Sequence, residues 1–130
     1  MFKGCKDLTE PPQLPATTLA NSCYEGMFYG CESLTSVPKL PAETMMVSCY
    51  NTMFAYCHVL TKATPLASVN LESGCYYGMF LGCSNLTQIP LLPATTLPSS
   101  CYYRMFAECS KIKISTVSNS EYKGVYRIPI

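Results

Sequence analysis

The chain has 130 residues, of which 48% are hydrophobic and 13% charged, and its net charge is +1. This composition excludes a disordered chain, and the length suits one domain. The nine basic and eight acidic residues are scattered along the chain, so neither a nucleic acid nor an anionic membrane surface is an expected partner. No apolar run approaches the roughly 18 residues that a membrane span needs.

A repeat of 26 residues organises the chain. Met-Phe pairs recur with this step. The pairs after the first one consist of Met27, Met53, Met79, Met105, Phe28, Phe54, Phe80 and Phe106. The nine cysteines form two series with the same step, namely Cys5, Cys31, Cys57, Cys83 and Cys109, and Cys23, Cys49, Cys75 and Cys101. A fixed period of roughly 20 to 50 residues predicts a solenoid, in which equivalent residues form columns through the core.

The Cys-Tyr-x-x-Met-Phe part of each repeat predicts a short helix. Apolar residues recur there every four residues, as in Met45, Cys49, Met53 and Cys57, which is a helical spacing. Thr or Asn stands before each such stretch and can cap its start, and glycine follows several of them. Interior glycines, such as Gly26, each cost about 1 kcal/mol in a helix, so we expect short α or 3₁₀ helices.

The next part of each repeat predicts a short strand. Leu34, Leu60 and Leu86 each begin a Leu-Thr-x-x-x-x-Leu segment, and its leucines are expected to point inward while the threonines face outward. Strands of successive repeats would stack in parallel at about 4.8 Å. Prolines inside the segments remove ladder donors and keep the strands short.

The motif L-T-x-h-x-x-L (h is a hydrophobic residue), followed in the next repeat by M-F-x-G-C, resembles the BspA-type leucine-rich repeats of bacterial surface proteins. The resemblance covers about residues 1–114. It implies a right-handed α/β solenoid with short parallel strands on a concave face and short helices on the other. It also implies adhesion or protein recognition at a cell surface, so that the parent protein would be at the cell surface or extracellular. Similar repeats occur in phage structural proteins.

The array is expected to cover 1–114, with four full repeats and partial ends, and 115–130 to form a C-terminal cap or tail. Met1 opens inside a repeat without a secretion signal, so we expect a fragment of a longer protein. The apolar end at Ile130 is as compatible with a boundary to a further domain as with a true C-terminus. A solenoid without a polar cap is expected to associate end to end.

Neither a metal site nor a catalytic site is expected. The cysteines lack C-x₂₋₄-C spacing, and His58 is the only histidine. Cysteines eight apart on a helix are about 12 Å apart, too far to share an ion or a disulfide. Disulfides between turns would be disfavoured at a helix spacing of about 8–10 Å, whereas tighter 3₁₀ turns would permit them. We interpret the series as buried free thiols, and we expect neither a cofactor nor an enzyme.

Two surfaces are candidates for recognition. One is the polar column on the expected concave face, formed by Glu10, Ser36, Lys62 and Gln88. The other is an aromatic patch of Tyr29, Tyr56, Tyr77, Tyr103 and Arg104, because Tyr and Arg dominate binding hot spots. The expected function is therefore non-catalytic binding of a protein or a surface glycan. The first alternative is a structural spacer in a phage or surface assembly, and an enzyme is a distant third.

Overall fold

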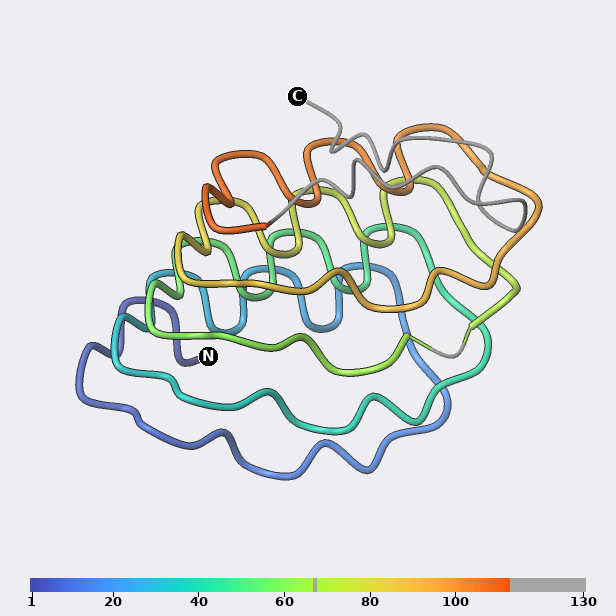
Figure 1. Cartoon of the computed structure of the whole chain (residues 1–130). Coiled ribbons are helices and arrows are strands. Elements are labelled where there is room, and N and C mark those ends of the chain that lie inside the picture. Colours follow the sequence, from blue (N-terminus) through green and yellow to red (C-terminus); the bar gives the residue numbers. More distant parts are fainter. Residues whose placement is uncertain (67, 113–130) are drawn as a thin grey trace.

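The structure is a computed structural model that describes residues 1–66 and 68–112. The chain winds into a stack of similar coils, from the blue N-terminal coil to the orange one in Figure 1. Each coil has one side that bends sharply several times and one side that runs in a smoother, extended path. The predicted tail, 115–130, and the last two residues of the predicted array lie outside the described residues.

The prediction of an α/β solenoid with helices and strands is wrong. Within residues 1–66 and 68–112 there is no helix, and the only β pairing is an isolated parallel bridge between Thr44 and Asn70. Successive 26-residue repeats do lie side by side and run parallel, since the N–H of Phe28 donates to the carbonyl of Met53 at 2.9 Å. The coils therefore stack, but turns and irregular chain build them.

A series of overlapping turns, which we call the turn ribbon, replaces each predicted helix. In the second coil it runs from about residue 20 to residue 31. Every second N–H donates to the carbonyl three residues earlier, as from Cys23 to Ala20 and from Met27 to Tyr24, both at 3.2 Å. The intervening N–H groups donate to the following coil, as from Tyr24 to Cys49 at 3.0 Å. Each amide thus has a partner without the i to i−4 bonds of an α-helix.

Positive φ angles recur every four residues in the ribbon, which is the physical reason why no α-helix forms there. In the second coil they fall at Ser22, Gly26 and Gly30, with φ of 54°, 59° and 69°. An α-helix needs φ near −63°, whereas a type II turn requires φ above zero at its third residue. The apolar spacing of four residues therefore reflects the repeat of the turns and not the 3.6-residue period of a helix.

The predicted strands are absent from the extended side because prolines limit the backbone pairing there. The N–H of Thr35 donates to the carbonyl of Thr9 at 2.9 Å, and Thr87 donates to Thr61 at 3.1 Å. Prolines such as Pro12 and Pro38 follow within three residues of these threonines, and proline cannot donate to a ladder. The pairing on this side therefore stays below the length of a strand.

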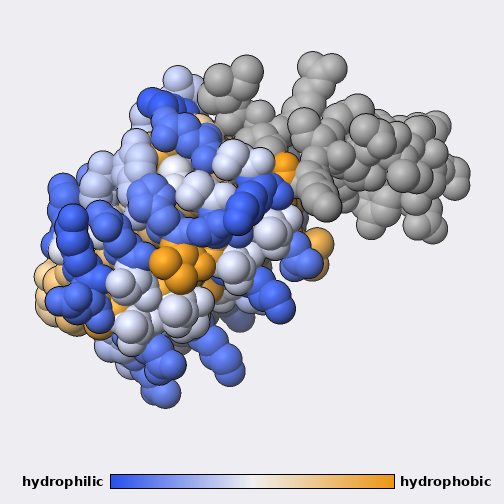
Figure 2. All heavy atoms as spheres, turned by 60° about the vertical axis from the view of Figure 1, so that its left-hand side comes forward, coloured by the Kyte–Doolittle hydropathy of each residue, from blue (hydrophilic) through white to orange (hydrophobic). Residues whose placement is uncertain are grey.

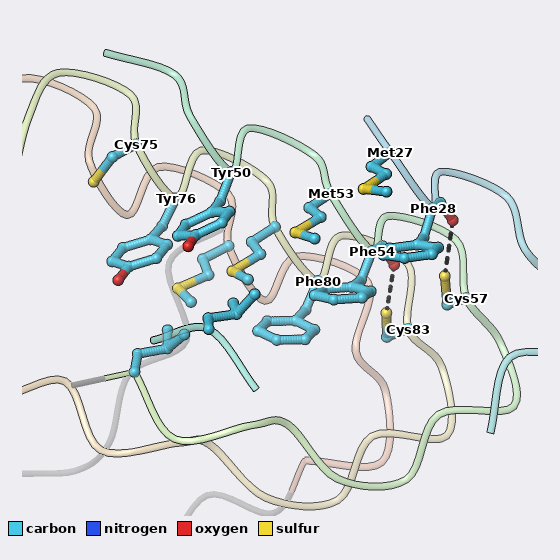
Figure 3. Close-up of a cluster of buried hydrophobic side chains, with 14 of the residues drawn as sticks. Met27, Phe28, Tyr50, Met53, Phe54, Cys57, Cys75, Tyr76, Phe80 and Cys83 are labelled. Atoms are coloured by element: carbon cyan, nitrogen blue, oxygen red, sulfur yellow. Dashed lines mark hydrogen bonds between the residues drawn. The ribbon is translucent and has the colours of Figure 1, made fainter. Parts of the chain in front are cut away.

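The core lies between the two sides of the coils and consists of columns of like residues. The rings of Phe28 and Phe54 stack with centroids 5.5 Å apart, and those of Tyr50 and Tyr76 with centroids 5.9 Å apart. Figure 3 shows these rings beside the methionines of the same repeats. The column residues with no exposed surface are Phe28, Phe54, Phe80, Met53, Met79, Met105, Leu34, Leu60 and Leu86, while Met27 and Phe106 are buried with a small exposed fraction.

Replacing Gly82 by alanine is expected to destabilise the chain by about 2–5 kcal/mol. Gly82 has φ +70°, and an added Cβ would lie 2.5 Å from the ring of Tyr56. The left-handed backbone costs about 1–2 kcal/mol for a residue with a Cβ, and overpacking costs about 1–3 kcal/mol. Gly4→Ala is the matched control, because Gly4 has φ +72° and no atom within 4 Å of the added Cβ. Equal losses in urea unfolding of the two variants would contradict the packing that we describe.

Candidate functional site

One cysteine series forms a ladder of hydrogen bonds across the coils. The Sγ of Cys57 donates to the carbonyl oxygen of Phe28 at 3.2 Å, and that of Cys83 donates to Phe54 at 3.1 Å. Figure 3 shows both bonds, each reaching into the preceding coil. Cys31 and Cys109 make the same contact with Phe2 and Phe80. Each thiol thus supplies a donor to a carbonyl in the interior, which a small hydrophobic residue could not do.

All nine cysteines are free, and seven of them are buried. Burial raises the pKa of the Cys57 and Cys75 thiols to about 12 and that of the Cys49 thiol to about 11. A nucleophilic cysteine needs the opposite shift, because the thiolate is the reactive form. The buried thiols are therefore unsuited to covalent catalysis near neutral pH. Cys5 and Cys23, the first members of the two series, are exposed.

A polar edge joins the coils where the turn ribbon passes into the extended side. The Nδ1 of His58 lies 3.4 Å from Oγ of Ser84, and Nδ2 of Asn85 donates to the carbonyl of His58 at 2.6 Å. Lys6 pairs with Glu32 at 3.3 Å in the same column. Figure 2, which brings the left-hand side of Figure 1 forward, shows hydrophilic residues around a small apolar area. His58 is exposed and contacts no carboxylate among these partners, so nothing in this arrangement makes it a general base.

The predicted aromatic patch divides into two pairs. The rings of Tyr29 and Tyr56 meet edge to face with centroids 5.4 Å apart, and those of Tyr77 and Tyr103 lie 5.3 Å apart. No ring contact among the described residues joins one pair to the other. Arg104 pairs with Glu108 of its own coil at 3.8 Å. Tyr103 is 51% exposed, whereas Tyr29, Tyr56 and Tyr77 are half-buried.

Tyr56 is held in a conformation that disfavours a bulky side chain. Its φ is +59°, in a column where Gly4, Gly30 and Gly82 also have positive φ. Its ring covers Gly82 and meets Tyr29 on one side, and it lies 6.2 Å from the ring of His58. A bulky residue at positive φ is a strained outlier, and its partial exposure makes it a candidate anchor for a partner.

The predicted polar column lies on the extended side of the coils. Glu10, Ser36, Lys62 and Gln88 are all exposed. Each follows a threonine, and the hydroxyl groups of Thr35 and Thr87 donate to the carbonyls of Thr9 and Thr61 at 2.9 and 3.2 Å. The column therefore presents four different side chains at equivalent positions of adjacent coils, although no sheet supports them.

Sequence reasoning missed two contacts near these surfaces. The ammonium of Lys3 lies 4.8 Å from the centre of the Tyr29 ring, a cation–π contact, and Nζ of Lys111 bonds Oδ1 of Asn85. In both cases the two residues are one 26-residue step apart, so aligning the repeats beneath one another would have placed them as neighbours. Their orientation depends on the turn ribbon and could not be read from the sequence.

Among the residues that the structure describes, no group of three or more His, Cys, Asp or Glu residues could hold a metal ion. No helix in that part of the chain is long and apolar enough to cross a membrane. No protein-family model, curated protein or solved structure matches the chain. The resemblance to BspA-type repeats therefore remains a prediction.

The free energy of unfolding is expected to fall as the pH rises above about 8.5. Unfolded thiols ionise near that pH, whereas burial keeps the pKa of Cys57 near 12 and that of Cys49 near 11. The stability from each buried thiol is complete below the unfolded pKa and is lost as pH rises towards the folded value. Urea unfolding between pH 7 and pH 10.5 measures this. Cys57→Ala should show a smaller fall, and a stability unchanged up to pH 10.5 would contradict the burial of the thiols.

Proposed function

We propose that the chain is a non-catalytic recognition or adhesion module that binds a protein or glycan through the polar column of Glu10, Ser36, Lys62 and Gln88. The observation that carries the proposal is the exposure of four chemically different side chains at equivalent positions of a hydrogen-bonded stack. A scaffold that holds such residues in place reduces the ordering cost of binding. The motif resemblance supports a setting at the surface of a cell.

The column favours a partner that runs along the stacking direction of the coils. Glu10 and Lys62 have opposite charges and are separated by the coil that carries Ser36. A partner with polar groups at matching intervals could satisfy both charges at once, whereas a small ligand at one coil would meet only one of them. Complementary charges of this kind contribute chiefly to specificity and to the rate of association.

Neither the buried thiols nor His58 is poised as a nucleophile or general base, which supports a non-catalytic role. The thiols of Cys57 and Cys75 are buried and have raised pKa values. His58 contacts Ser84, Asn85 and Tyr56, none of which would hold it as a base. These features are compatible with a surface that binds without changing its ligand.

The double variant Glu10→Lys with Lys62→Glu tests the polar column, because it reverses both charges and keeps the net charge. We expect saturable binding to at least one ligand on a glycan array or a panel of immobilised extracellular proteins. The double variant should weaken that binding at least tenfold, which corresponds to about 1.4 kcal/mol.

Tyr103→Ala is the matched control, since Tyr103 is exposed on the turn ribbon. It should leave the affinity within about twofold. Loss of binding in Tyr103→Ala, with none in the charge-reversed variant, would move the site to the tyrosine pairs. Absence of saturable binding to either panel would contradict the recognition proposal.

The second candidate is a structural module that assembles through its N-terminal coil. Cys5 and Cys23 are exposed, and Phe2 and Tyr24 are half-buried, although their equivalents two coils on are buried. An uncovered core edge favours stacking on another molecule. Light scattering should then detect association that grows with concentration, and a monodisperse monomer at millimolar concentration would contradict this candidate.

A further inference from the structure

The threonines that precede the polar column are hydrogen-bonded at two coil boundaries and not at the one between them. Thr35 donates its N–H and its hydroxyl group to the carbonyl of Thr9, both at 2.9 Å. Thr87 does the same to Thr61, at 3.1 and 3.2 Å. Among the described residues, the N–H of Thr61 has no acceptor and the carbonyl of Thr35 has no donor. The second and third coils thus lack the bonds that join the coils on either side of them.

This opening is local, because the same two coils are joined elsewhere. On the turn ribbon, the N–H of Phe28 donates to the carbonyl of Met53 at 2.9 Å. At the other end of the extended side, the N–H of Met45 donates to the carbonyl of Asn70 at 3.0 Å. The two free backbone groups therefore belong to coils that are held beside each other, shown by the teal and green paths of the extended side in Figure 1.

The free groups lie at the surface and next to the polar column. Thr35 and Thr61 are exposed, and so are Ser36 and Lys62, which follow them in the chain. Unpaired backbone groups at a surface are available to pair with another chain. The boundary thus presents one backbone donor, one backbone acceptor and the ammonium group of Lys62.

An extended peptide carries the complementary pair of groups. In a hydrogen-bonded pair of antiparallel strands, each residue exchanges both its N–H and its carbonyl with the residue opposite, so both groups of one extended residue point to the same side. One residue of a peptide that runs along the stack can therefore donate to the carbonyl of Thr35 and accept from the N–H of Thr61. Main-chain bonds of this kind supply affinity when a peptide pairs with a sheet.

The charges of the polar column favour a peptide over a neutral glycan. Glu10 and Lys62 are two coils apart, which is about 9.6 Å at a spacing of about 4.8 Å. The residues before and after the bonded one have side chains on the same face of an extended peptide, about 6.6 Å apart. Long side chains at these two places span the difference, so a basic one can pair with Glu10 and an acidic one with Lys62. A neutral sugar would leave both charges without a counterion.

We propose that the open boundary between Thr35 and Thr61 binds one residue of an extended peptide, with a basic residue directly before it and an acidic residue directly after it. This inference rests on the proposed function of the polar column and specifies its partner. It also fixes the direction of the peptide. Because the peptide N–H meets the second coil and the peptide carbonyl meets the third, the basic residue lies towards Glu10 and the acidic residue towards Lys62.

Amide hydrogen exchange, measured by NMR on the ¹⁵N-labelled chain, tests the boundary itself. In the free chain, the Thr61 amide should exchange about tenfold faster than those of Thr35 and Thr87, which are also exposed but hydrogen-bonded. A saturating amount of the blocked peptide Ser-Thr-Lys-Val-Glu-Thr-Ser should slow the exchange of Thr61 and leave that of Thr87 unchanged. Equal exchange of the three amides in the free chain, or no slowing of Thr61 by the peptide, would overturn the inference.

Three matched peptides test the ligand. The peptide with Lys and Glu exchanged has the same composition and should bind about tenfold more weakly. N-methylation of the Val removes the donor to Thr35 and should weaken binding as much. N-methylation of the Glu, whose N–H points to the opposite side, should leave the affinity within about twofold. Equal affinities of the four peptides would contradict the proposed pairing.

The double variant Glu10→Lys with Lys62→Glu separates this inference from the recognition proposal. It should reverse the preference and bind the peptide with Lys and Glu exchanged more tightly than the original one. Failure of every peptide, with saturable binding to a glycan that the double variant loses, would overturn the inference and leave recognition by the polar column in place. Absence of saturable binding to peptides, proteins and glycans alike would overturn both.

Discussion

The structure depends on how the backbone amides of the turn ribbon are shared between two directions. Every second N–H closes a turn within its own coil, and the others reach the next coil, as from Phe54 to Met79 at 2.9 Å. In the second coil this division gives every N–H from Ser22 to Cys31 a carbonyl partner, as a buried backbone requires. It also fixes the coils in register, so that each residue lies beside its equivalent one repeat away.

Register has a direct consequence for the core. Phe rings stack on Phe rings and Tyr rings on Tyr rings, with interplanar angles of 10° or less along both columns. The cysteines gain a role from the same geometry, because the thiols of Cys31, Cys57, Cys83 and Cys109 each donate to a carbonyl of the preceding coil. The same register shapes the surface, because each exposed position of the repeat forms a row of side chains at regular intervals across the coils. The recognition that we propose for the polar column uses this regularity.

The sequence predicted the stacking of repeats and the columns, because the 26-residue step has no insertion. It misled us about the local structure, because an apolar residue at every fourth position was interpreted as a helical face. Two signals pointed to turns: the spacing never alternates between three and four, and glycines recur four apart at Gly74, Gly78 and Gly82. Ser22, Thr52 and Tyr56 take the same positive φ without being glycine, so composition hid the pattern in other repeats.

The sequence also predicted the candidate surfaces only in part. The exposure of Glu10, Ser36, Lys62 and Gln88 follows from their place beside the outward threonines. The pairing of Tyr77 with Tyr103 follows from the 26-residue step, whereas the pairing of Tyr29 with Tyr56 does not. Tyr29 and Tyr56 come from different columns, and their rings meet at a site where Tyr56 has positive φ. Helical spacing in the sequence could not predict contacts that depend on the backbone conformation of the turn ribbon.

The most direct test of the turn ribbon is the measurement of scalar couplings through hydrogen bonds by NMR on a ¹⁵N,¹³C-labelled chain. The account predicts couplings from the amide nitrogen of Phe28 to the carbonyl carbon of Met53 and from that of Phe54 to that of Met79. It predicts a coupling from Met53 to Tyr50 within the coil as well. Couplings from Phe54 to Tyr50, four residues earlier, together with no coupling to Met79, would indicate helices and would contradict the account.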